Sequence, residues 1–375
     1  MIYLDNGATT PMDPLAVEEM LPYLTEHFGN ASSLHHLGAE SARALRASRQ
    51  TFADALGCDP AEIVFTSGGT EADNLGVRGA AQSARKDRRH ALIFDLEHPA
   101  VRNQTDFLEA MGFTVETIPT KRDGVLDVDA LEGMLRPKET ALVCVMHANN
   151  EIGTIQPLGD IAELLEDVCP HAHLHVDAVQ SFTKLDVRPQ SLGATTLALA
   201  GHKIHGPKGV GALYVKRGSR LRSQVAGGGQ ERGVRSGTEN VAGIVGFAAA
   251  TRLAMANREK DVARMTALRD HLLERILREI PDVDVNGSAT RRLCNNINVN
   301  IAGARAEVML HGMEERGVLV SSGSACHAGQ TGPSHVLKAI GLTEKDTGSL
   351  RITLSRHTTQ ADVDACASAL NAVVP

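Results

Sequence analysis

The chain has 375 residues, of which 42% are hydrophobic and 22% are charged, a balance that excludes wholesale disorder. Thirty-eight Lys and Arg against 45 Asp and Glu give a formal net charge of −7. Neither nucleic acid nor an anionic membrane is therefore expected as the main partner. With 3% aromatic residues and no Trp, platforms for base stacking are not expected either.

The cysteines and the N-terminus indicate a reducing compartment. The six cysteines, at positions 58, 144, 169, 294, 326 and 366, form no CxxC pair, so neither a disulfide framework nor a structural zinc site is expected. The first residues, MIYLDNGATT, lack the basic start and apolar run of a signal peptide. The longest apolar run, residues 241–250, is far too short to cross a membrane. We expect a cytoplasmic protein.

Apolar runs of strand length recur through the first two-thirds of the chain, at residues 62–66, 91–95, 114–118, 141–147, 174–178, 196–200 and 210–215. Helical patterns lie between the early runs, at residues 71–84, 100–111 and 161–168. This alternation predicts an α/β fold with a mainly parallel, seven-stranded sheet that helices cover on both faces. Such sheets bind ligands at the carboxyl ends of their strands.

The sequence pattern changes in the last third of the chain. A helical region rich in Ala, Leu and Arg runs from residue 241 to 279, and after Pro281 short elements follow at residues 296–301, 306–316, 318–321, 350–354 and 362–373. This pattern predicts a smaller α+β domain, which the short strand at residues 2–4 joins. We expect a large domain over residues 14–255 and a small domain over residues 1–13 and 256–375.

Two Gly-rich turns follow predicted strands. The turn TSGGTE, residues 66–71, opens a helix, and its backbone N–H groups and helix dipole favour an anion; it is otherwise a tight turn with Thr70 as the N-cap. Lys203 follows another apolar strand. A lysine in such a place loses its proton readily and forms Schiff bases, although a solvated turn is the simpler interpretation.

His173, His175 and Asp177 alternate, so they share one face of a strand. A metal site that includes the nearby His171 is one interpretation. However, His171 and His173 precede the strand's apolar part, where surface histidines are the simpler interpretation, whereas Asp177 lies at its exit, followed by Gln180.

Polar residues follow five separate strands and converge on one edge of the sheet. They are Thr70, His98, Asn150, Asp177 and Lys203, although His98 could merely cap a helix and Asn150 could belong to a polar turn. A phosphate-binding turn, an Asp for a pyridine nitrogen and a Lys for an aldehyde are the groups that pyridoxal phosphate requires.

The motifs YLDNGATTP, TSGGTEADN, MHANNEIGTIQP, HVDAVQS, GHKIHGPKGVGALY, GGGQERGVRSGTEN and SSGSAC follow one another over nearly the whole chain. In these motifs and their order the chain resembles the cysteine desulfurases, which are fold-type-I pyridoxal-phosphate enzymes. The resemblance implies the conversion of L-cysteine to L-alanine, with the sulfur passing to a cysteine of the enzyme as a persulfide.

The resemblance also implies roles for residues around the cofactor. Lys203 would bind the cofactor as a Schiff base and later act as an acid and base. Asp177 would pair with the pyridine nitrogen, and Gln180 would bond to the ring oxygen. Asn150 would lie near the same oxygen and the substrate. His98 would stack over the ring and carry a proton.

Further roles concern the phosphate and the neighbouring subunit. By the resemblance, Gly69, Thr70 and His202 would hold the phosphate. Thr238 would reach the phosphate of the neighbouring subunit, which implies a homodimer with shared active sites. Many relatives have a Ser where this chain has Ala200. We therefore expect weaker cofactor retention, with Ser67 or water replacing the missing bond.

The resemblance places the nucleophile at Cys326, in a Gly-rich segment that is typical of a mobile loop; the thiolate is the form that attacks. Arg351 matches the arginine that clamps the substrate carboxylate, a group that a guanidinium binds through two bonds. Asn30 is also expected to face the substrate, whereas Arg356 is expected to form a structural ion pair.

The spacing from Cys326 to residues 334–337 resembles the subgroup with a long catalytic loop. That subgroup donates sulfur to iron–sulfur scaffolds and tRNA-thiolation carriers, so an acceptor protein of this kind is an expected partner. Three alternatives stay open: a selenocysteine lyase, because His327 follows Cys326; a β-lyase or aminotransferase; and a sulfur carrier or scaffold-binding protein without catalysis.

Overall fold

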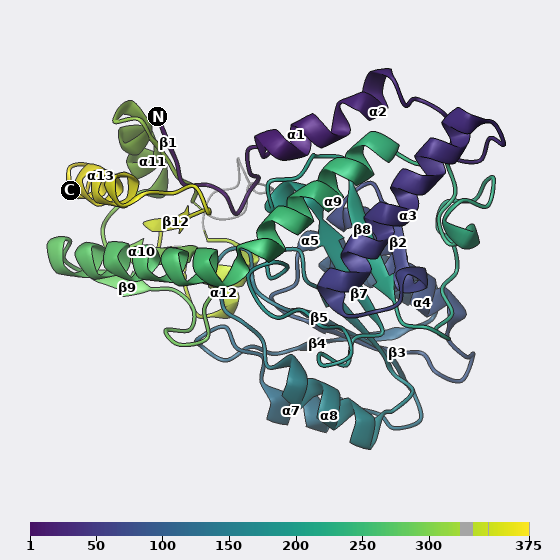
Figure 1. Ribbon diagram of the computed structural model, residues 1–375. Helices are drawn as coiled ribbons and strands as arrows, with labels where there is room; N and C mark the ends of the chain where they lie inside the picture. The colour runs from purple at the N-terminus through teal and green to yellow at the C-terminus, as the bar shows by residue number, and fades with distance from the viewer. Residues whose placement is uncertain (323–332, 344, 375) are drawn as a thin grey trace.

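A seven-stranded sheet forms the centre of the larger lobe of the computed structural model, which describes residues 1–322, 333–343 and 345–374 (Figure 1). Its strands are β2 (Ile63–Thr66), β3 (His90–Phe94), β4 (Thr114–Ile118), β5 (Thr140–Met146), β6 (His173–Asp177), β7 (Thr196–Ala200) and β8 (Gly211–Val215). Their order is β2-β8-β7-β6-β5-β3-β4, and only β8 runs antiparallel to its neighbours. The predicted α/β fold is confirmed.

Helices cover both faces of the sheet because its central strands are apolar on both sides. One face packs against α3 (His36–Leu56), α7 (Val128–Met134), α8 (Leu158–Val168) and α9 (Val241–Ala256). The other face packs against α4 (Gly69–Ser83), α5 (Pro99–Arg102) and α6 (Thr105–Ala110). Leu174 and Val176 belong to the first core, so the alternating side chains of His173, His175 and Asp177 face α4.

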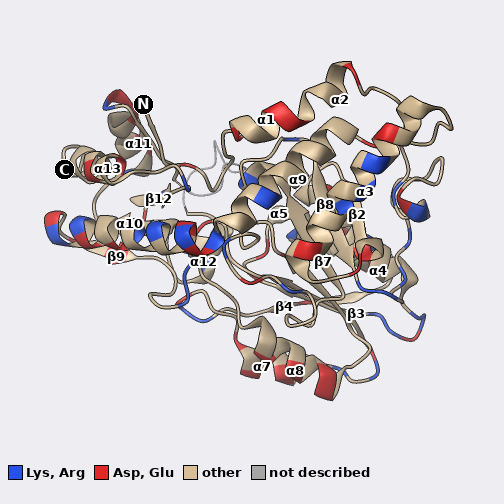
Figure 2. Ribbon diagram, viewed as in Figure 1, with Lys and Arg blue, Asp and Glu red and all other residues tan. Residues whose placement is uncertain are grey.

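A second hydrophobic cluster lies in the smaller lobe, which carries both chain termini (Figure 1). Its antiparallel sheet has the order β12 (Ser349–Thr353), β10 (Asn296–Ile301), β9 (Val283–Val285). The helices around it are α10 (Arg258–Glu279), α11 (Ala306–Glu315) and α13 (Gln360–Asn371), and charged residues are dense along α10 (Figure 2). β1 (Ile2–Tyr3) pairs in parallel with β11 (Val318–Leu319), which brings the N-terminus to this lobe.

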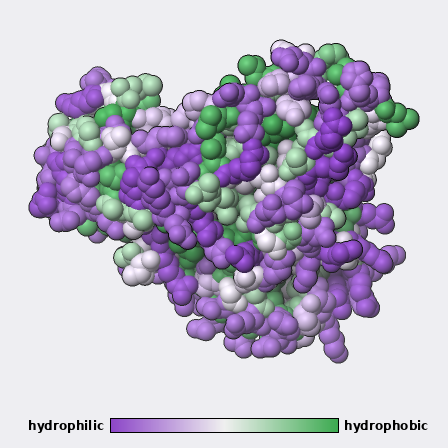
Figure 3. Space-filling view, in the orientation of Figure 1, coloured by the Kyte–Doolittle hydropathy of each residue, from purple (hydrophilic) through white to green (hydrophobic). Residues whose placement is uncertain are grey.

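The remaining short elements connect or flank these layers. They are α1 (Pro14–Met20), α2 (Pro22–Thr25), α12 (His335–Ala339) and the 3-10 helices η1 (Pro60–Glu62), η2 (Gly201–Lys203) and η3 (Glu231–Gly233). Large apolar side chains are exposed on α1, on α2 and on the segment after them: Leu15, Val17, Leu21, Leu24, Phe28 and Leu34. Hydrophobic residues are visible along this upper edge in Figure 3.

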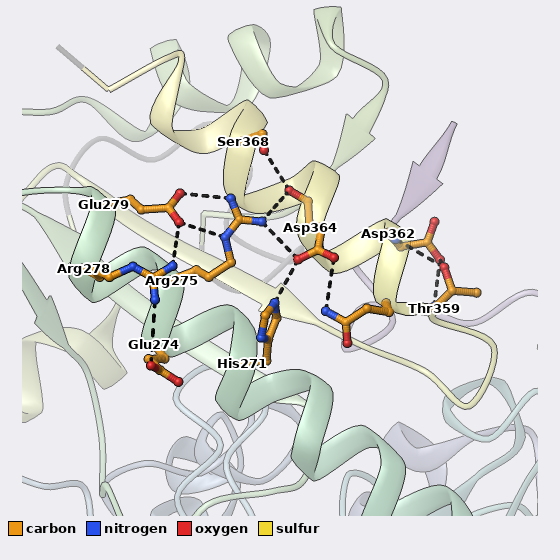
Figure 4. Close-up of polar contacts among 10 residues, drawn as sticks. His271, Glu274, Arg275, Arg278, Glu279, Thr359, Asp362, Asp364 and Ser368 are labelled. Atoms are coloured by element: carbon orange, nitrogen blue, oxygen red, sulfur yellow. Dashed lines mark hydrogen bonds and ion pairs between the residues drawn. The ribbon is translucent and has the colours of Figure 1, made fainter.

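Polar contacts join α10 to α13 on the surface of the smaller lobe (Figure 4). Asp364 of α13 accepts hydrogen bonds from His271 (2.8 Å) and Arg275 (3.0 Å) of α10, and Arg275 also pairs with Glu279 (2.8 Å). The hydrogen bond from His271, followed by those from Gln360 and Arg275, lowers the pKa of Asp364. These contacts cover the apolar seam between the two helices.

Two helices that the sequence predicts as continuous are each divided. The predicted helix 100–111 is α5 and α6, which Asn103 and Gln104 separate. The predicted helical region 241–279 is α9 and α10, and it breaks at Asn257, where φ is −113° and ψ is 5°. The Asn257 side-chain amide donates to the Leu253 carbonyl; asparagine competes with helical hydrogen bonding in this way. The predicted domain boundary next to this break stays a prediction.

Among the described residues, none of the helices has both the length and the apolar character that crossing a bilayer requires.

Candidate active site

A cavity of about 230 Å³ lies where the carboxyl ends of the central strands meet β12 of the smaller lobe. Nine of the twelve predicted site residues line it: Gly69, Thr70, His98, Asn150, Asp177, Gln180, His202, Lys203 and Arg351. The convergence follows from topology, because parallel strands deliver the residues after their carboxyl ends to one edge of the sheet.

Lys203 ends η2, the short 3-10 turn directly after β7. Its Nζ donates hydrogen bonds to the carbonyls of Gly7 (2.6 Å) and Ala8 (2.7 Å). Burial, followed by the positive charge of Arg351, lowers the pKa of Lys203 to about 8. A substantial fraction of this amine is thus neutral, and able to act as a nucleophile or a base, near neutral pH.

Asp177 ends β6 and is buried at the floor of the cavity. Its Oδ1 accepts the N–H of Val179 (2.9 Å). Burial, followed by the negative charge of Asp73, raises the pKa of Asp177 to about 8. A buried carboxyl group of this kind gains stability from a cationic partner, and a protonated pyridine nitrogen is such a partner.

The start of α4 lines one end of the cavity. A Cβ on Gly69 would lie 2.9 Å from a methyl carbon of Val179, so this close approach requires glycine. Ser67 does not face the cavity: its hydroxyl and its N–H both donate to Glu71, which also pairs with Arg235 (2.7 Å). The predicted replacement of the missing Ala200 bond by Ser67 would therefore require Ser67 to leave Glu71.

His98 caps a helix and also lines the cavity. Its Nδ1 accepts the N–H of Ala100 (3.1 Å) and so caps α5, while the ring lines the cavity.

Gln180 donates from Nε2 to the Gly7 carbonyl (3.0 Å). His202 contacts the Thr9 hydroxyl (3.2 Å), and burial lowers its pKa to about 4, so this ring is neutral.

Arg351 reaches the cavity from β12 and is almost completely buried. Its Nη2 pairs with Asp5 (2.7 Å), and its Nη1 donates to the Asn150 carbonyl (3.0 Å). Within the described part of the chain its Nε has no hydrogen-bond partner. Arg351 is thus oriented and still has a donor for an anionic ligand. Arg356 instead pairs with Asp13, which is the structural ion pair that the sequence predicts.

Two predicted site residues are not brought into this cavity. Asn30 is exposed and accepts the N–H of Ser32 (2.9 Å). Thr238 is exposed outside the cavity. Cys326 lies outside the described residues.

Sequence reasoning missed Asp73 and the carbonyls of Gly7 and Ala8, which line the cavity. The spacing of Asp73 gives one signal that could have found it, because Asp73 lies three residues after Thr70 and thus on the same face of α4.

The five described cysteines are poor nucleophiles. Cys144, Cys169, Cys294 and Cys366 are buried, and burial raises the pKa of each thiol. The pKa of the less buried Cys58 rises to about 12. Within residues 1–322, 333–343 and 345–374, no group of three or more His, Cys, Asp or Glu side chains is arranged to hold a metal ion.

Comparison with known proteins gives the family. The model of the aminotransferase class-V family matches residues 2–366. The chain belongs to this family. It is 46% identical over 365 residues to a protein of Trichormus azollae named "Cysteine desulfurase", an alignment that covers 97% of this chain and 90% of the relative.

Solved structures agree with this assignment. The fold is similar to that of a "NifS-like protein", with a TM-score of 0.93 and 33% identity over 99% of this chain and 98% of the other. It is also similar to the structure titled "SspA in complex with cysteine", with a TM-score of 0.83 and 35% identity over 96% of this chain and 100% of the other. The resemblance to the cysteine desulfurases is confirmed, and this family depends on pyridoxal phosphate.

The cavity fits that cofactor. It offers a buried amine with a lowered pKa, a buried carboxyl group, and a glycine-lined helix start for a phosphate.

Proposed function

We propose that this protein is a cysteine desulfurase that converts L-cysteine to L-alanine and transfers the sulfur to Cys326 as a persulfide. The observation that carries the proposal is one cavity lined by Lys203, with its lowered pKa, by the buried Asp177 and by the buried Arg351. These three groups serve an aldehyde, a pyridine nitrogen and a substrate carboxylate respectively.

Pyridoxal phosphate is the proposed cofactor. Lys203 would hold its aldehyde carbon, Asp177 its ring nitrogen and Gln180 its ring oxygen. The start of α4, at Gly69 and Thr70, would hold the phosphate together with His202, and His98 would cover the ring. When bound, this cofactor supplies an electron sink for the bonds broken at the substrate's α-carbon.

Residues of the chain perform the steps around the substrate. Arg351 would bind the carboxylate of L-cysteine through its Nε, which has no partner among the described residues, and Asn150 would lie beside the substrate. Lys203 would accept the α-proton, since its lowered pKa leaves part of the amine neutral. His98 would serve as a second proton carrier.

Sulfur transfer is assigned to Cys326 by its motif. Its thiolate would attack the sulfur of the substrate, so that a sulfur–sulfur bond forms as the carbon–sulfur bond breaks. Protons then complete alanine, and the sum is cysteine plus the Cys326 thiol giving alanine plus the Cys326 persulfide. The described cysteines offer no competing nucleophile, because burial raises the pKa of each.

We further propose a cytoplasmic homodimer with domains at residues 14–255 and at 1–13 with 256–375. The exposed apolar side chains on α1 and α2 support the dimer, and the exposed Thr238 is available to a neighbouring subunit's phosphate. Asn30 would face the substrate from its exposed segment. An iron–sulfur scaffold or a tRNA-thiolation carrier would then take the sulfur from Cys326.

The test is a mass spectrum of the Cys326 peptide after brief incubation with L-cysteine and no reductant, with alanine quantified alongside. We expect one added sulfur atom on that peptide and alanine in proportion. Cys326→Ala should abolish both, whereas Cys58→Ala, which alters the described cysteine that burial protects least, should abolish neither. Pyruvate or sulfide without the added sulfur would overturn the proposal in favour of a lyase.

A further inference from the structure

An uninterrupted chain of hydrogen bonds runs along the face of the large sheet that α4 covers, between β6, β7 and α4. His173 Nε2 lies 2.7 Å from Thr196 Oγ1, and the same oxygen lies 2.9 Å from Nδ1 of His175. His175 Nε2 lies 3.2 Å from Oδ1 of Asp73. His175, Thr196 and Asp73 are all buried, so these bonds are shielded from water.

The two ends of this chain open into different cavities. Asp73 and Asp177 both line the active-site cavity, and the negative charge of Asp73 raises the pKa of Asp177. His173 lines a separate hollow of about 460 Å³. Residues at or next to the amino ends of β5 and β7 also line it, and these strand ends lie opposite to the active site. The hydrogen bonds therefore connect the floor of the active site with the far edge of the sheet.

The donors and acceptors permit two consistent arrangements. In one, His173 Nε2–H donates to Thr196, the Thr196 hydroxyl donates to His175 Nδ1, and His175 Nε2–H donates to the Asp73 carboxylate. In the other, every donor is reversed and Asp73 carries the proton. One arrangement becomes the other when His173 Nδ1 takes up one proton and each bond passes one proton on, so that Asp73 gains a proton and no group is oxidised or reduced.

We propose that His173, Thr196, His175 and Asp73 form a proton relay along the face of the sheet beneath α4, which sets the charge beside Asp177 in the cofactor-binding cavity. A proton taken up at His173 Nδ1 appears on Asp73, and a proton leaves by the same route. The relay rests on the proposed binding of pyridoxal phosphate, because that cofactor's ring nitrogen is the cation that Asp177 would face. All four are positioning residues, since none is assigned to the reacting atoms.

The surroundings suit a relay that carries protons without storing charge on its histidines. Burial lowers the pKa of His173 to about 3 and that of His175 to about 4, so both rings are neutral at pH 7. Burial raises the pKa of Asp73 to about 8, so the protonated and ionised forms of this carboxyl group are both accessible near neutrality.

Other titratable groups surround the two ends. At the inner end, the negative charge of Asp73 raises the pKa of Asp177, of Glu97 after β3 and of Cys144 of β5. The positive charge of Lys203 lowers the pKa of Asp177. The outer hollow is lined by cations and one further histidine: Arg85, Arg88, His171, Lys216, Arg217 and Arg220. After burial, the neighbouring His175 is the second cause that lowers the pKa of His173.

The test substitutes Thr196 in the cofactor-loaded protein and follows the pH dependence of the visible absorbance of the bound cofactor. Thr196→Val removes the only hydroxyl of the relay at nearly constant volume. We expect the pH at the midpoint of the absorbance change to fall by about half to one unit. A shift of this size is equivalent to the loss of one buried hydrogen bond. Without the hydroxyl, Asp73 holds its proton more tightly. Asp177 and the groups that it faces then no longer have an ionised Asp73 beside them. Thr196→Ser, which restores the hydroxyl, should return the midpoint to the wild-type value.

Thr140→Val is the matched control. Thr140 Oγ1 also bonds to a buried histidine of this sheet, Nδ1 of His90 (2.9 Å). The other nitrogen of that ring, Nε2, lies 3.6 Å from Glu116 at the sheet edge and not at the cofactor cavity. Thr140→Val should therefore destabilise the protein to a similar extent and leave the absorbance midpoint unchanged.

A double-mutant cycle separates a relay from local repacking. In the Asp73→Asn background, Thr196→Val should produce no further shift, because its effect passes through the Asp73 carboxyl group. Additive shifts, or a Thr196→Val midpoint equal to that of wild type, would overturn the proposal. The absorbance readout does not require turnover, so failure of the relay and failure of the desulfurase assignment are distinguishable.

Discussion

Gly76 of α4 determines whether His175 fits beneath the helix. A Cβ added at Gly76 would lie 2.4 Å from Nδ1 and 2.5 Å from Cε1 of the His175 ring, and 3.3 Å from Thr196 Oγ1. The ring would have to move by about 1 Å to regain an ordinary contact of about 3.5 Å. Its hydrogen bonds to Thr196 (2.9 Å) and Asp73 (3.2 Å) would then exceed hydrogen-bonding distance.

We predict that Gly76→Ala lowers the free energy of unfolding by about 1–5 kcal/mol. Overpacking a filled interior costs about 1–3 kcal/mol, and a buried polar group left without its partner costs a further 1–3 kcal/mol or so. Against this, Ala is favoured over Gly in a helix by about 1 kcal/mol. The steric and polar costs exceed the gain in helix propensity.

Equilibrium urea unfolding, followed by far-ultraviolet circular dichroism, measures this difference. Gly133→Ala in α7 is the matched control, because a Cβ at Gly133 would meet nothing within 4 Å. There the propensity term acts alone, and stability should rise by a few tenths to about 1 kcal/mol. A Gly76→Ala protein as stable as Gly133→Ala would refute the close packing of α4 on His175.

Three further predictions concern the active site. Burial lowers the pKa of Lys203 to about 8. The rate of cofactor uptake by the apoprotein, measured by stopped-flow absorbance, should therefore rise about tenfold per pH unit up to that pH and level off above it. A rate that continues to increase up to about pH 10 would contradict this. Arg351→Lys should raise the KM for L-cysteine by about 10- to 100-fold through loss of the paired donors, whereas Arg356→Lys should leave KM unchanged because Arg356 pairs with Asp13. Asp177→Asn should weaken cofactor binding about tenfold or more in equilibrium dialysis, and unchanged affinity would remove Asp177 from the ring nitrogen.

The sequence predicted the sheet well because strand signals are local. The central strands β5 and β7 are continuous apolar runs, and the structure places β4, β7 and β10 at the residues predicted for them. The edge that collects the polar residues also followed, since parallel strands point their carboxyl ends the same way. Lys203 and Asp177 could therefore be assigned to one site before any distance was known.

The sequence predicted less well wherever the answer depended on a partner distant in the chain. His173 was expected among surface histidines near the sheet edge, yet its ring bonds to Thr196 on the neighbouring strand. Asp73 carried no motif role, and its partner His175 lies 102 residues further along.

Sequence alone thus determined which elements form, which residues end the strands, and which chemistry those residue types serve. Only the tertiary structure decided how each site residue is held and charged: Lys203 between carbonyls almost 200 positions away, and Arg351 against Asp5 of the N-terminal segment. Apolar periodicity is set by neighbours in the chain, whereas desolvation and hydrogen-bond pairing depend on distances that exist only after the elements pack.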